Sequence, residues 1–231
     1  MPINFHKTVY MRITHKKSPL MFQYSFDNNI LSEVSHYKYL GLWITNNLDW
    51  TKHIDQTVNN ANRKLFFLRR ALRLSTPRVR LLAYKSIVLP ILDYAAIIWD
   101  PFTKTNVNKI EKIQKKAVRF VYNSYGRTSV SDLLNRAALI SITERNRVSR
   151  LKFLYQLVKG HFKINIDGLI SFSSGYSTRQ RHNLTITPFT QRNNCFKYSF
   201  FPRTVTEWNQ LTNDEVLQLS VTSFIGNLSA Q

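Results

Sequence analysis

The spacing of apolar residues changes near residue 50, and this change constrains the fold more than any other feature. Before it, apolar and polar residues alternate over 9–13 and 22–26, which is the period of half-buried strands. After it, apolar residues recur every three or four positions over 54–68 and 107–121, which is the period of amphipathic helices. We therefore expect an α+β chain, mainly α, in which a small antiparallel strand set precedes a helical bundle.

The periodicity divides the chain into three predicted domains. Residues 1–51 hold the strand candidates, and a further candidate at 37–45 contains Gly41, which indicates a bulge or a close backbone approach. Residues 52–163 hold the longer helices. Residues 164–231 lose the helical period at first and gain Ser, Asn, Thr and Gly, so we expect an irregular region of loops, one or two short strands and short closing helices.

Within the helical region, two prolines locate one helix closely. Thr76 and Pro77 form a helix-start signal, with Thr76 as the N-cap and Pro77 at the first helical position. Pro90 is expected to kink this helix, because proline donates no main-chain hydrogen bond. The apolar residues expected to pack from this helix are Val79, Leu82, Ala83 and Ile87.

The charge balance is strongly one-sided. The 231 residues include 33 Lys and Arg against 13 Asp and Glu, a formal net charge of +20, and such an excess attracts polyanions. Residues 52–85 hold nine bases and one acid, and residues 104–163 hold fourteen bases and three acids. Solvated helix faces usually mix the two signs, so we predict contact with nucleic acid, with an ordinary solvated face as the alternative.

A basic helix face opposite an apolar face can follow a phosphate backbone while the helix packs on its neighbours. The expected partner is RNA, an RNA–DNA hybrid or DNA, bound through phosphates with little dependence on sequence. Trp50, Trp99 and Trp208 are expected to anchor packing rather than to stack on bases. The candidate nucleic-acid-binding residues on the helices are Lys64, Arg69, Arg70, Arg73, Arg78, Arg80, Lys109, Lys112, Lys115, Lys116 and Arg119.

Several kinds of site are not expected. A single cysteine, Cys195, excludes an internal disulfide and a cysteine-rich zinc site. The acids are thinly spread, and the only adjacent pair is Asp214 with Glu215, so we predict no catalytic residue and no metal ligand. The six glycines form no phosphate-binding loop, and neither a cofactor nor a small-molecule site is evident.

The sequence also indicates where in the cell the protein is expected. No segment reaches the ~20 apolar residues of a membrane-spanning helix, and the first residues lack a signal-peptide pattern. Because disulfides are absent as well, we expect an intracellular protein, nuclear or cytoplasmic, that is not secreted and does not contact membranes.

Five blocks of residues, in this order, carry a family resemblance. The first two are Asn4-Phe5-His6-Lys7-Thr8 and Tyr37-Lys38-Tyr39-Leu40-Gly41-Leu42, the second being followed by Leu48-Asp49-Trp50 and His53-Ile54. The third is Tyr84-Lys85-Ser86-Ile87-Val88-Leu89-Pro90, followed by Asp93-Tyr94 and Ile98-Trp99. The last two are Ile110-Glu111-Lys112-Ile113-Gln114-Lys115-Lys116-Ala117-Val118-Arg119 and Phe200-Phe201-Pro202-Arg203-Thr204, the latter followed by Trp208-Asn209-Gln210-Leu211. Together they resemble the reverse transcriptases of non-LTR (LINE-type, jockey-like) retrotransposons over essentially the whole chain.

The resemblance implies a C-terminal fragment of such an enzyme. The family's polymerase copies RNA into DNA with Mg²⁺, and its catalytic aspartates precede the block that begins here at Asn4. The sequence contains no Asp-Asp dipeptide. The resemblance therefore implies the end of a palm in 1–51, a thumb in 52–163, no polymerase activity by this chain alone, and a palm and fingers upstream. Mg²⁺ is implied for the full-length enzyme rather than for this chain.

The resemblance also implies roles for individual residues. Lys7 matches a basic position where a polymerase uses a cation near the leaving pyrophosphate, or it is a solvated lysine at a strand end. Tyr39, Leu40 and Gly41 match the primer-grip turn, where close approach to the primer favours glycine, or they form a plain β-bulge. Of this block, Lys38, Tyr39 and Gly41 are candidate nucleic-acid-binding residues. Two other possibilities stay open for the whole chain: a freestanding, domesticated nucleic-acid-binding protein, and a relic of a transposon reading frame without a function.

Overall fold

The computed structural model describes residues 4, 7–14, 16–173 and 182–228. Phe5 and His6, which belong to the first block of the family resemblance, lie outside the described residues. The fold is α+β and mainly α, as the apolar spacing predicts. The described strands are β1 (Val9–Tyr10), β2 (Ser25–Phe26), β3 (Asn29–Ile30), β4 (Ser32–Glu33), β5 (His36–Tyr39) and β6 (Leu42–Thr45).

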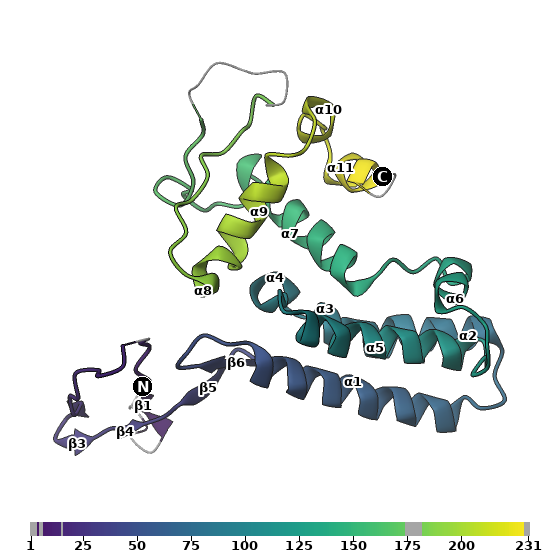
Figure 1. Ribbon diagram of the computed structural model, residues 1–231, viewed down its shortest axis with the longest axis horizontal. Helices are drawn as coiled ribbons and strands as arrows, with labels where there is room; N and C mark the ends of the chain where they lie inside the picture. Colours follow the sequence, from purple (N-terminus) through teal and green to yellow (C-terminus); the bar gives the residue numbers. More distant parts are fainter. Residues whose placement is uncertain (1–3, 5–6, 15, 174–181, 229–231) are drawn as a thin grey trace.

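The described helices begin directly after the strands (Figure 1). They are α1 (Thr51–Ala71), α2 (Pro77–Ala83), α3 (Leu89–Asp93), α4 (Ala96–Trp99), α5 (Lys104–Val121), α6 (Val130–Arg136), α7 (Ile142–Val158), α8 (Asn194–Lys197), α9 (Phe200–Trp208), α10 (Asn213–Val216) and α11 (Val221–Leu228), with a π-helical turn, η2 (Tyr84–Val88), between α2 and α3.

Helices α1 and α5 run side by side in the same direction (Figure 1). The α2–α4 segment returns the chain in the opposite direction and packs against both helices. Three polar contacts keep the two helices in register, because Thr51 contacts Asn106, Asp55 contacts Lys109, and Asn62 contacts Lys116. The first hydrophobic core lies beneath these contacts. Its fully buried side chains include Ile54, Ala61, Leu65, Tyr84, Val88, Leu92, Trp99, Ile110, Ile113 and Ala117.

The return segment begins where the sequence predicts, with Thr76 as N-cap and Pro77 in the first turn of α2. Of the four apolar residues expected to pack from it, Ala83 packs against the first core, and the prediction is wrong for the other three. Val79, Leu82 and Ile87 are exposed, whereas the buried face carries Arg80, Tyr84, Val88, Leu89 and Leu92. The reason is that Arg80 and Tyr84 find polar partners inside the fold: the Tyr84 hydroxyl, for example, donates to Gln114 Oε1 at 3.2 Å.

Pro90 is accommodated by the π-helical turn that precedes it. The Leu89 N–H donates to the carbonyl of Tyr84, five residues earlier. This wider turn allows helical structure to continue past a residue that has no N–H to donate and whose ring crowds the preceding turn.

The N-terminal strands form three separate pairs rather than one small antiparallel sheet. β1 pairs with β4 in parallel, whereas β2–β3 and β5–β6 are antiparallel. The alternating residues expected to be half buried, such as Phe22 and Phe26, are exposed. The β6 strand packs against α1 and buries Leu42, so burial of an apolar side chain holds this strand in place.

The strand candidate at 37–45 is a hairpin. Its strands β5 and β6 are joined by Leu40 and Gly41, whose φ angles of 45° and 85° are both positive, as in the two-residue turns that match strand twist. Gly41 also makes the close approach that the sequence suggests, since a Cβ added there would lie 3.2 Å from Cε1 of Tyr94.

The second hydrophobic core is built by α7, α9, α10 and α11. Tyr155 of α7 stacks on Phe224 of α11, with ring centroids 4.4 Å apart, and Trp208 is fully buried beside them. Between α7 and α9 the described chain is irregular, with α8 and an isolated bridge between Phe172 and Ile186. Helix α7 contributes Ile142 to the first core and its later residues to the second, and the domain limits 1–51, 52–163 and 164–231 stay a prediction.

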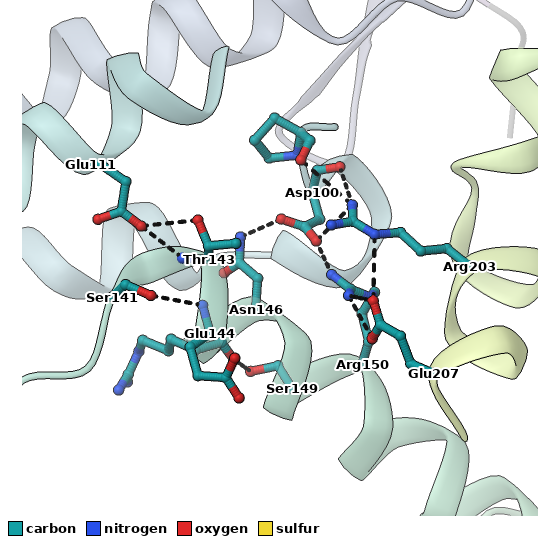
Figure 2. Close-up of polar contacts among 12 residues, drawn as sticks. Asp100, Glu111, Ser141, Thr143, Glu144, Asn146, Ser149, Arg150, Arg203 and Glu207 are labelled. Carbon is teal, nitrogen blue, oxygen red and sulfur yellow. Dashed lines mark hydrogen bonds and ion pairs between the residues drawn. The ribbon is translucent and has the colours of Figure 1, made fainter. Parts of the chain in front are cut away.

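A buried cluster of charges joins the two cores (Figure 2). Arg150 of α7 contacts Asp100 at the end of α4, and its Nη2 donates to both carboxylate oxygens of Glu207 on α9 at 2.7 and 2.8 Å. Arg203 lies 2.9 Å from Asp100, and the Asn146 amide donates to Asp100 at 2.7 Å. Burial lowers the pKa of Arg150, while the Glu207 carboxylate opposes that change. Arg150 and Arg203 therefore both link Asp100 to Glu207.

Candidate nucleic-acid interface

The parallel pairing of α1 and α5 places two polar stripes opposite one another. On α5, Lys109, Lys112, Lys116 and Arg119 recur at spacings of three and four residues and so share a face. At the N-terminal end of the pair, Lys109 Nζ lies 2.6 Å from a carboxylate oxygen of Asp55. Further along, Lys116 donates to the Asn62 amide oxygen at 3.2 Å. The Asp55 carboxylate therefore compensates the positive charge of α5 at the N-terminal end of the helix pair. Toward the C-terminal end, the partner of Lys116 is a neutral amide, and the positive charge is left largely uncompensated.

At that C-terminal end, two adjoining pockets of about 210 and 460 Å³ share Phe66, Arg69 and Tyr125. We call them together the α1–α5 groove. None of the residues that line it is acidic. They are Asn62, Leu65, Phe66, Arg69, Arg70, Arg73, Arg80, Lys116, Arg119, Phe120, Asn123 and Tyr125.

Arg69 lies between the two exposed aromatic rings of the groove. Its guanidinium carbon is 5.7 Å from the Phe66 ring centroid and 5.2 Å from the Tyr125 ring centroid. Both aromatic side chains are 53% exposed. A guanidinium within about 6 Å of a ring face is attracted by the ring quadrupole, so the three side chains form a cationic, aromatic wall that remains open to solvent.

Arg80 has a different position from the other predicted residues, because it is buried beneath the groove. Its Nε and Nη2 donate to the carbonyls of Leu72 and Arg73 at 3.1 and 2.6 Å, and its Nη1 donates to those of Phe120 and Val121 at 3.2 and 3.4 Å. These carbonyls belong to the C-terminal ends of α1 and α5, where a helix carries its partial negative charge. Arg80 therefore neutralises both helix ends.

Arg119 adds to this effect at the end of α5. Its Nη1 donates to the carbonyls of Ser124 and Gly126 at 3.0 and 3.3 Å, in the loop that carries Tyr125. Arg70 and Arg73 are exposed at the end of α1. Among the cations of the groove, Arg80 and Arg119 thus bind protein carbonyls, whereas Arg70 and Arg73 are exposed to solvent.

The remaining helical candidates lie outside the groove. Lys112 and Lys115 are exposed on α5, and Arg78 is exposed in the first turn of α2. Lys64 lines a different pocket of about 520 Å³, together with Asn60, Arg63, Phe67 and Ile91. The structure therefore brings together Arg69, Arg70, Arg73, Arg80, Lys116 and Arg119, and it leaves the others on neighbouring surfaces.

The candidates suggested by the family resemblance lie at the opposite end of α1 (Figure 1). Lys38, Tyr39 and Gly41 belong to the β5–β6 hairpin, where Lys38 and Tyr39 are exposed. The 21 residues of α1 correspond to a length of about 30 Å, so the hairpin and the α1–α5 groove are distinct surfaces. Lys7 is exposed just before β1, and its N–H donates to the Asn4 carbonyl at 3.0 Å.

Two side chains of the groove, Phe66 and Tyr125, were not predicted. Phe66 follows Asn62 by four residues and therefore lies on the polar stripe of α1, although its neighbour Leu65 is buried in the core. An aromatic residue at a polar helical position was the available signal. Tyr125 follows the end of α5, and no periodic pattern extends into that loop.

The residues that the structure describes hold neither a metal-binding cluster nor a candidate membrane-spanning helix. Among them, no group of three or more His, Cys, Asp or Glu is arranged to hold a metal ion. Within the same ranges, no helix has the length and apolar character needed to cross a bilayer.

Comparison with known proteins adds one relative. A curated protein of Drosophila melanogaster, described as "Probable RNA-directed DNA polymerase from transposon BS", is 29% identical to this chain over 125 residues. The match covers 52% of this chain and 14% of the length of that protein. No family model matches the chain, and no solved structure matches it. Half of the chain is therefore similar to a small part of a transposon RNA-directed DNA polymerase.

Proposed function

We propose that this chain is the nucleic-acid-binding C-terminal portion of an RNA-directed DNA polymerase from a non-LTR retrotransposon of the LINE, jockey-like type. The observation that carries the proposal is the acid-free α1–α5 groove with the lysines of α5 beside it. The similarity to a transposon polymerase supports the same conclusion. The helices 52–163 then act as a thumb that holds RNA, an RNA–DNA hybrid or DNA.

The spacing of the cations suits a phosphate backbone. Lys109 and Arg119 are ten residues apart on α5, which is about 15 Å at 1.5 Å per residue. Phosphates of one strand recur about every 3.4 Å along a duplex, so this face is long enough to follow about four of them. Contacts of this kind fix position without reading sequence.

We further propose that the polymerase chemistry resides elsewhere in the full enzyme. The sequence has no Asp-Asp dipeptide, and several carboxylates of the helical part are already engaged: Asp55 with Lys109, Asp93 with Arg145, and Asp100 with Arg150. The Mg²⁺ ions of the full-length enzyme would then be bound by other parts of it. Metal-dependent incorporation of deoxynucleotides by this isolated chain would contradict this part of the proposal.

The surface of the N-terminal strands is consistent with a larger enzyme. Leu20, Met21 and Phe22 are 90%, 76% and 64% exposed, and Ile30 is 65% exposed. Contiguous exposed apolar side chains commonly mark an interface. We propose that the palm of the polymerase covers them.

A salt-titrated binding assay tests the proposal. The affinity for a fluorescent RNA–DNA hybrid, a DNA duplex and single-stranded RNA is measured at increasing salt concentrations. If Arg70, Arg73, Lys112, Lys115 and Lys116 contact phosphates, the slope of log affinity against log salt is about −4 to −5 for duplexes. An affinity that does not change with salt, or no binding to any of the three, would refute the proposed function.

A further inference from the structure

We propose that the α1–α5 groove binds an unpaired nucleotide, whose base stacks on the aromatic wall of Phe66 and Tyr125 while its phosphate contacts Arg70 and Arg73. This inference rests on the proposed function and goes beyond it. Binding through phosphates along α5 accepts any duplex, whereas the groove selects a single-stranded end or a displaced base. The ligand is an RNA or DNA nucleotide outside a double helix.

The first support is the exposure of the two aromatic rings. Phe66 and Tyr125 are each 53% exposed, although the first hydrophobic core begins at Leu65 and Phe120 in the same groove. The groove therefore leaves ring surface uncovered where the fold has apolar surface available to cover it. Stacking of a base on such a ring is favourable and tolerates any sequence, since every base has a π-face.

The second support is the position of the Arg69 guanidinium. It lies within 6 Å of both ring centroids, so it holds the two rings in one surface and leaves a cation beside the stacking position. A guanidinium plane can itself stack on a base, in addition to its attraction for the adjacent phosphate. Arg69 can therefore contact both the base and the phosphate of one nucleotide.

The third support is that a buried cation, Arg80, binds carbonyls at the C-terminal ends of α1 and α5. The C-terminal end of a helix disfavours an anion, and here two such ends meet at one place because α1 and α5 run in parallel. Arg80 donates to carbonyls from both ends while it is buried. It is therefore a positioning residue, which offsets the negative ends and leaves the field of Arg70 and Arg73 available to a phosphate.

The size of the groove explains why the base must be unpaired. The larger pocket, about 460 Å³, falls within the range of small-molecule pockets, about 300–1,000 Å³. A base in the interior of a duplex is covered on both faces by its neighbours and cannot present a face to Phe66 or Tyr125. An overhanging or displaced base has no such cover.

The test compares four labelled probes at one ionic strength, using the full 231-residue chain. They are a blunt duplex, the same duplex with a short RNA overhang, the same duplex with a DNA overhang, and a duplex whose overhang is abasic. The abasic overhang keeps the phosphates and lacks the bases. We expect the two overhangs with bases to bind about ten-fold more tightly than the other two probes, which corresponds to about 1.4 kcal/mol.

Variants connect this preference to the groove. Phe66→Leu and Tyr125→Leu keep an apolar side chain and remove the ring, and each is expected to abolish most of the preference for the overhangs that carry bases. Phe67→Leu is the matched control, since Phe67 is 54% exposed, adjacent in sequence, and lines the other pocket. Thermal unfolding by circular dichroism establishes that each variant is folded.

The outcomes separate the two proposals. Equal binding of the abasic and natural overhangs would overturn the inference and leave the proposed function standing, and so would a preference that survives both groove variants. Loss of the preference in Phe67→Leu but not in Phe66→Leu would also overturn it. Failure to bind any of the four probes would refute the proposed function itself.

Discussion

The hydroxyl of Tyr94 donates a 2.8 Å hydrogen bond to the carbonyl of Leu40, which lies 54 residues earlier in the chain. This contact ties the turn of the β5–β6 hairpin to the junction between α3 and α4. The Tyr94 ring also covers Gly41, where an added Cβ would lie 3.2 Å from Cε1. The hairpin is therefore held at its turn end, both by this hydrogen bond and by the buried Leu42 that directly follows Gly41.

Replacement of Gly41 tests this attachment. Gly41→Ala is expected to destabilise the chain by about 2 kcal/mol, because alanine is strained at φ +85° and its Cβ would displace the Tyr94 ring from its hydrogen bond. The matched control is Gly160→Ala, which has φ +68° and no atom within 4 Å of the added Cβ. We expect the control to cost about 1 kcal/mol less in urea unfolding. Equal losses would show that Tyr94 moves aside without cost.

The α5 lysines are expected to determine the salt dependence of binding. The double variant Lys112→Gln/Lys115→Gln removes two exposed cations, so the slope of log affinity against log salt should become less steep by about 1.8. Lys152→Gln/Lys163→Gln removes the same charge from exposed positions outside the α1–α5 pair and serves as the control. A similar change in both variants would indicate attraction to net charge alone.

The buried charge cluster predicts an asymmetric response to mutation. Arg150→Met removes the more deeply buried of the two guanidinium groups that Asp100 and Glu207 share, leaving Arg203 as the other, and the side chain it replaces is 2% exposed. Breaking a buried pair in this way costs about 3–5 kcal/mol. Arg147→Met removes a partly exposed pair with Glu144 three residues away and is expected to cost less than about 1 kcal/mol. Chemical denaturation of the two variants measures the difference.

His53 is expected to make stability depend on pH. Burial lowers its pKa in the folded chain, and the positive charge of Lys38 lowers it further. The unfolded chain therefore takes up a proton near pH 6.5 while the folded chain does not, so its contribution is complete above that pH and is lost as the pH falls below it. The maximum slope is about 1.4 kcal/mol per pH unit.

The variant His53→Gln should remove this part of the pH dependence, and His36→Gln, at an exposed position, should retain it. Unfolding free energies between pH 7.5 and 5, roughly one unit above and below the ordinary histidine value, provide the measurement. If stability of the parent chain rises as the pH falls through this interval, the assigned direction is wrong.

The sequence predicts those parts of the fold that depend on neighbours along the chain. The period of α1 and α5 and the Thr76–Pro77 start of α2 are local signals, and the helices begin and end close to the expected residues. The buried face of α2 is not local. It depends on Arg80 reaching carbonyls of Phe120 and Val121, 40 and 41 residues away.

The candidate site likewise has local features, which the sequence predicts, and contacts between distant residues, which it does not predict. The sequence alone indicates that this part of the chain is basic. It does not indicate that α1 and α5 run in parallel, and this direction is what brings the cations together at one end of the helix pair. These cations are Arg69, Arg70, Arg73, Lys116 and Arg119. Tyr125 joins them because Arg119 binds the loop around it. The strand pairs were not predicted correctly because alternation of apolar and polar residues predicts that one face of a strand is buried. Within the described residues, no other element covers the apolar side chains Phe22 and Phe26, which are exposed.

The cluster around Arg150 has a consequence for motion. An apolar contact between two halves can slide, because dispersion and hydrophobic attraction have no preferred direction. A guanidinium that holds Glu207 through two oxygens and Asp100 through another nitrogen is planar and directional, so it fixes the orientation of α7 and α9, in the second core, relative to the end of α4, in the first core. Rotation of one half against the other would separate buried charges before any new contact formed. The two halves should therefore move as one body, and a nucleic acid bound at α5 would carry the C-terminal half with it.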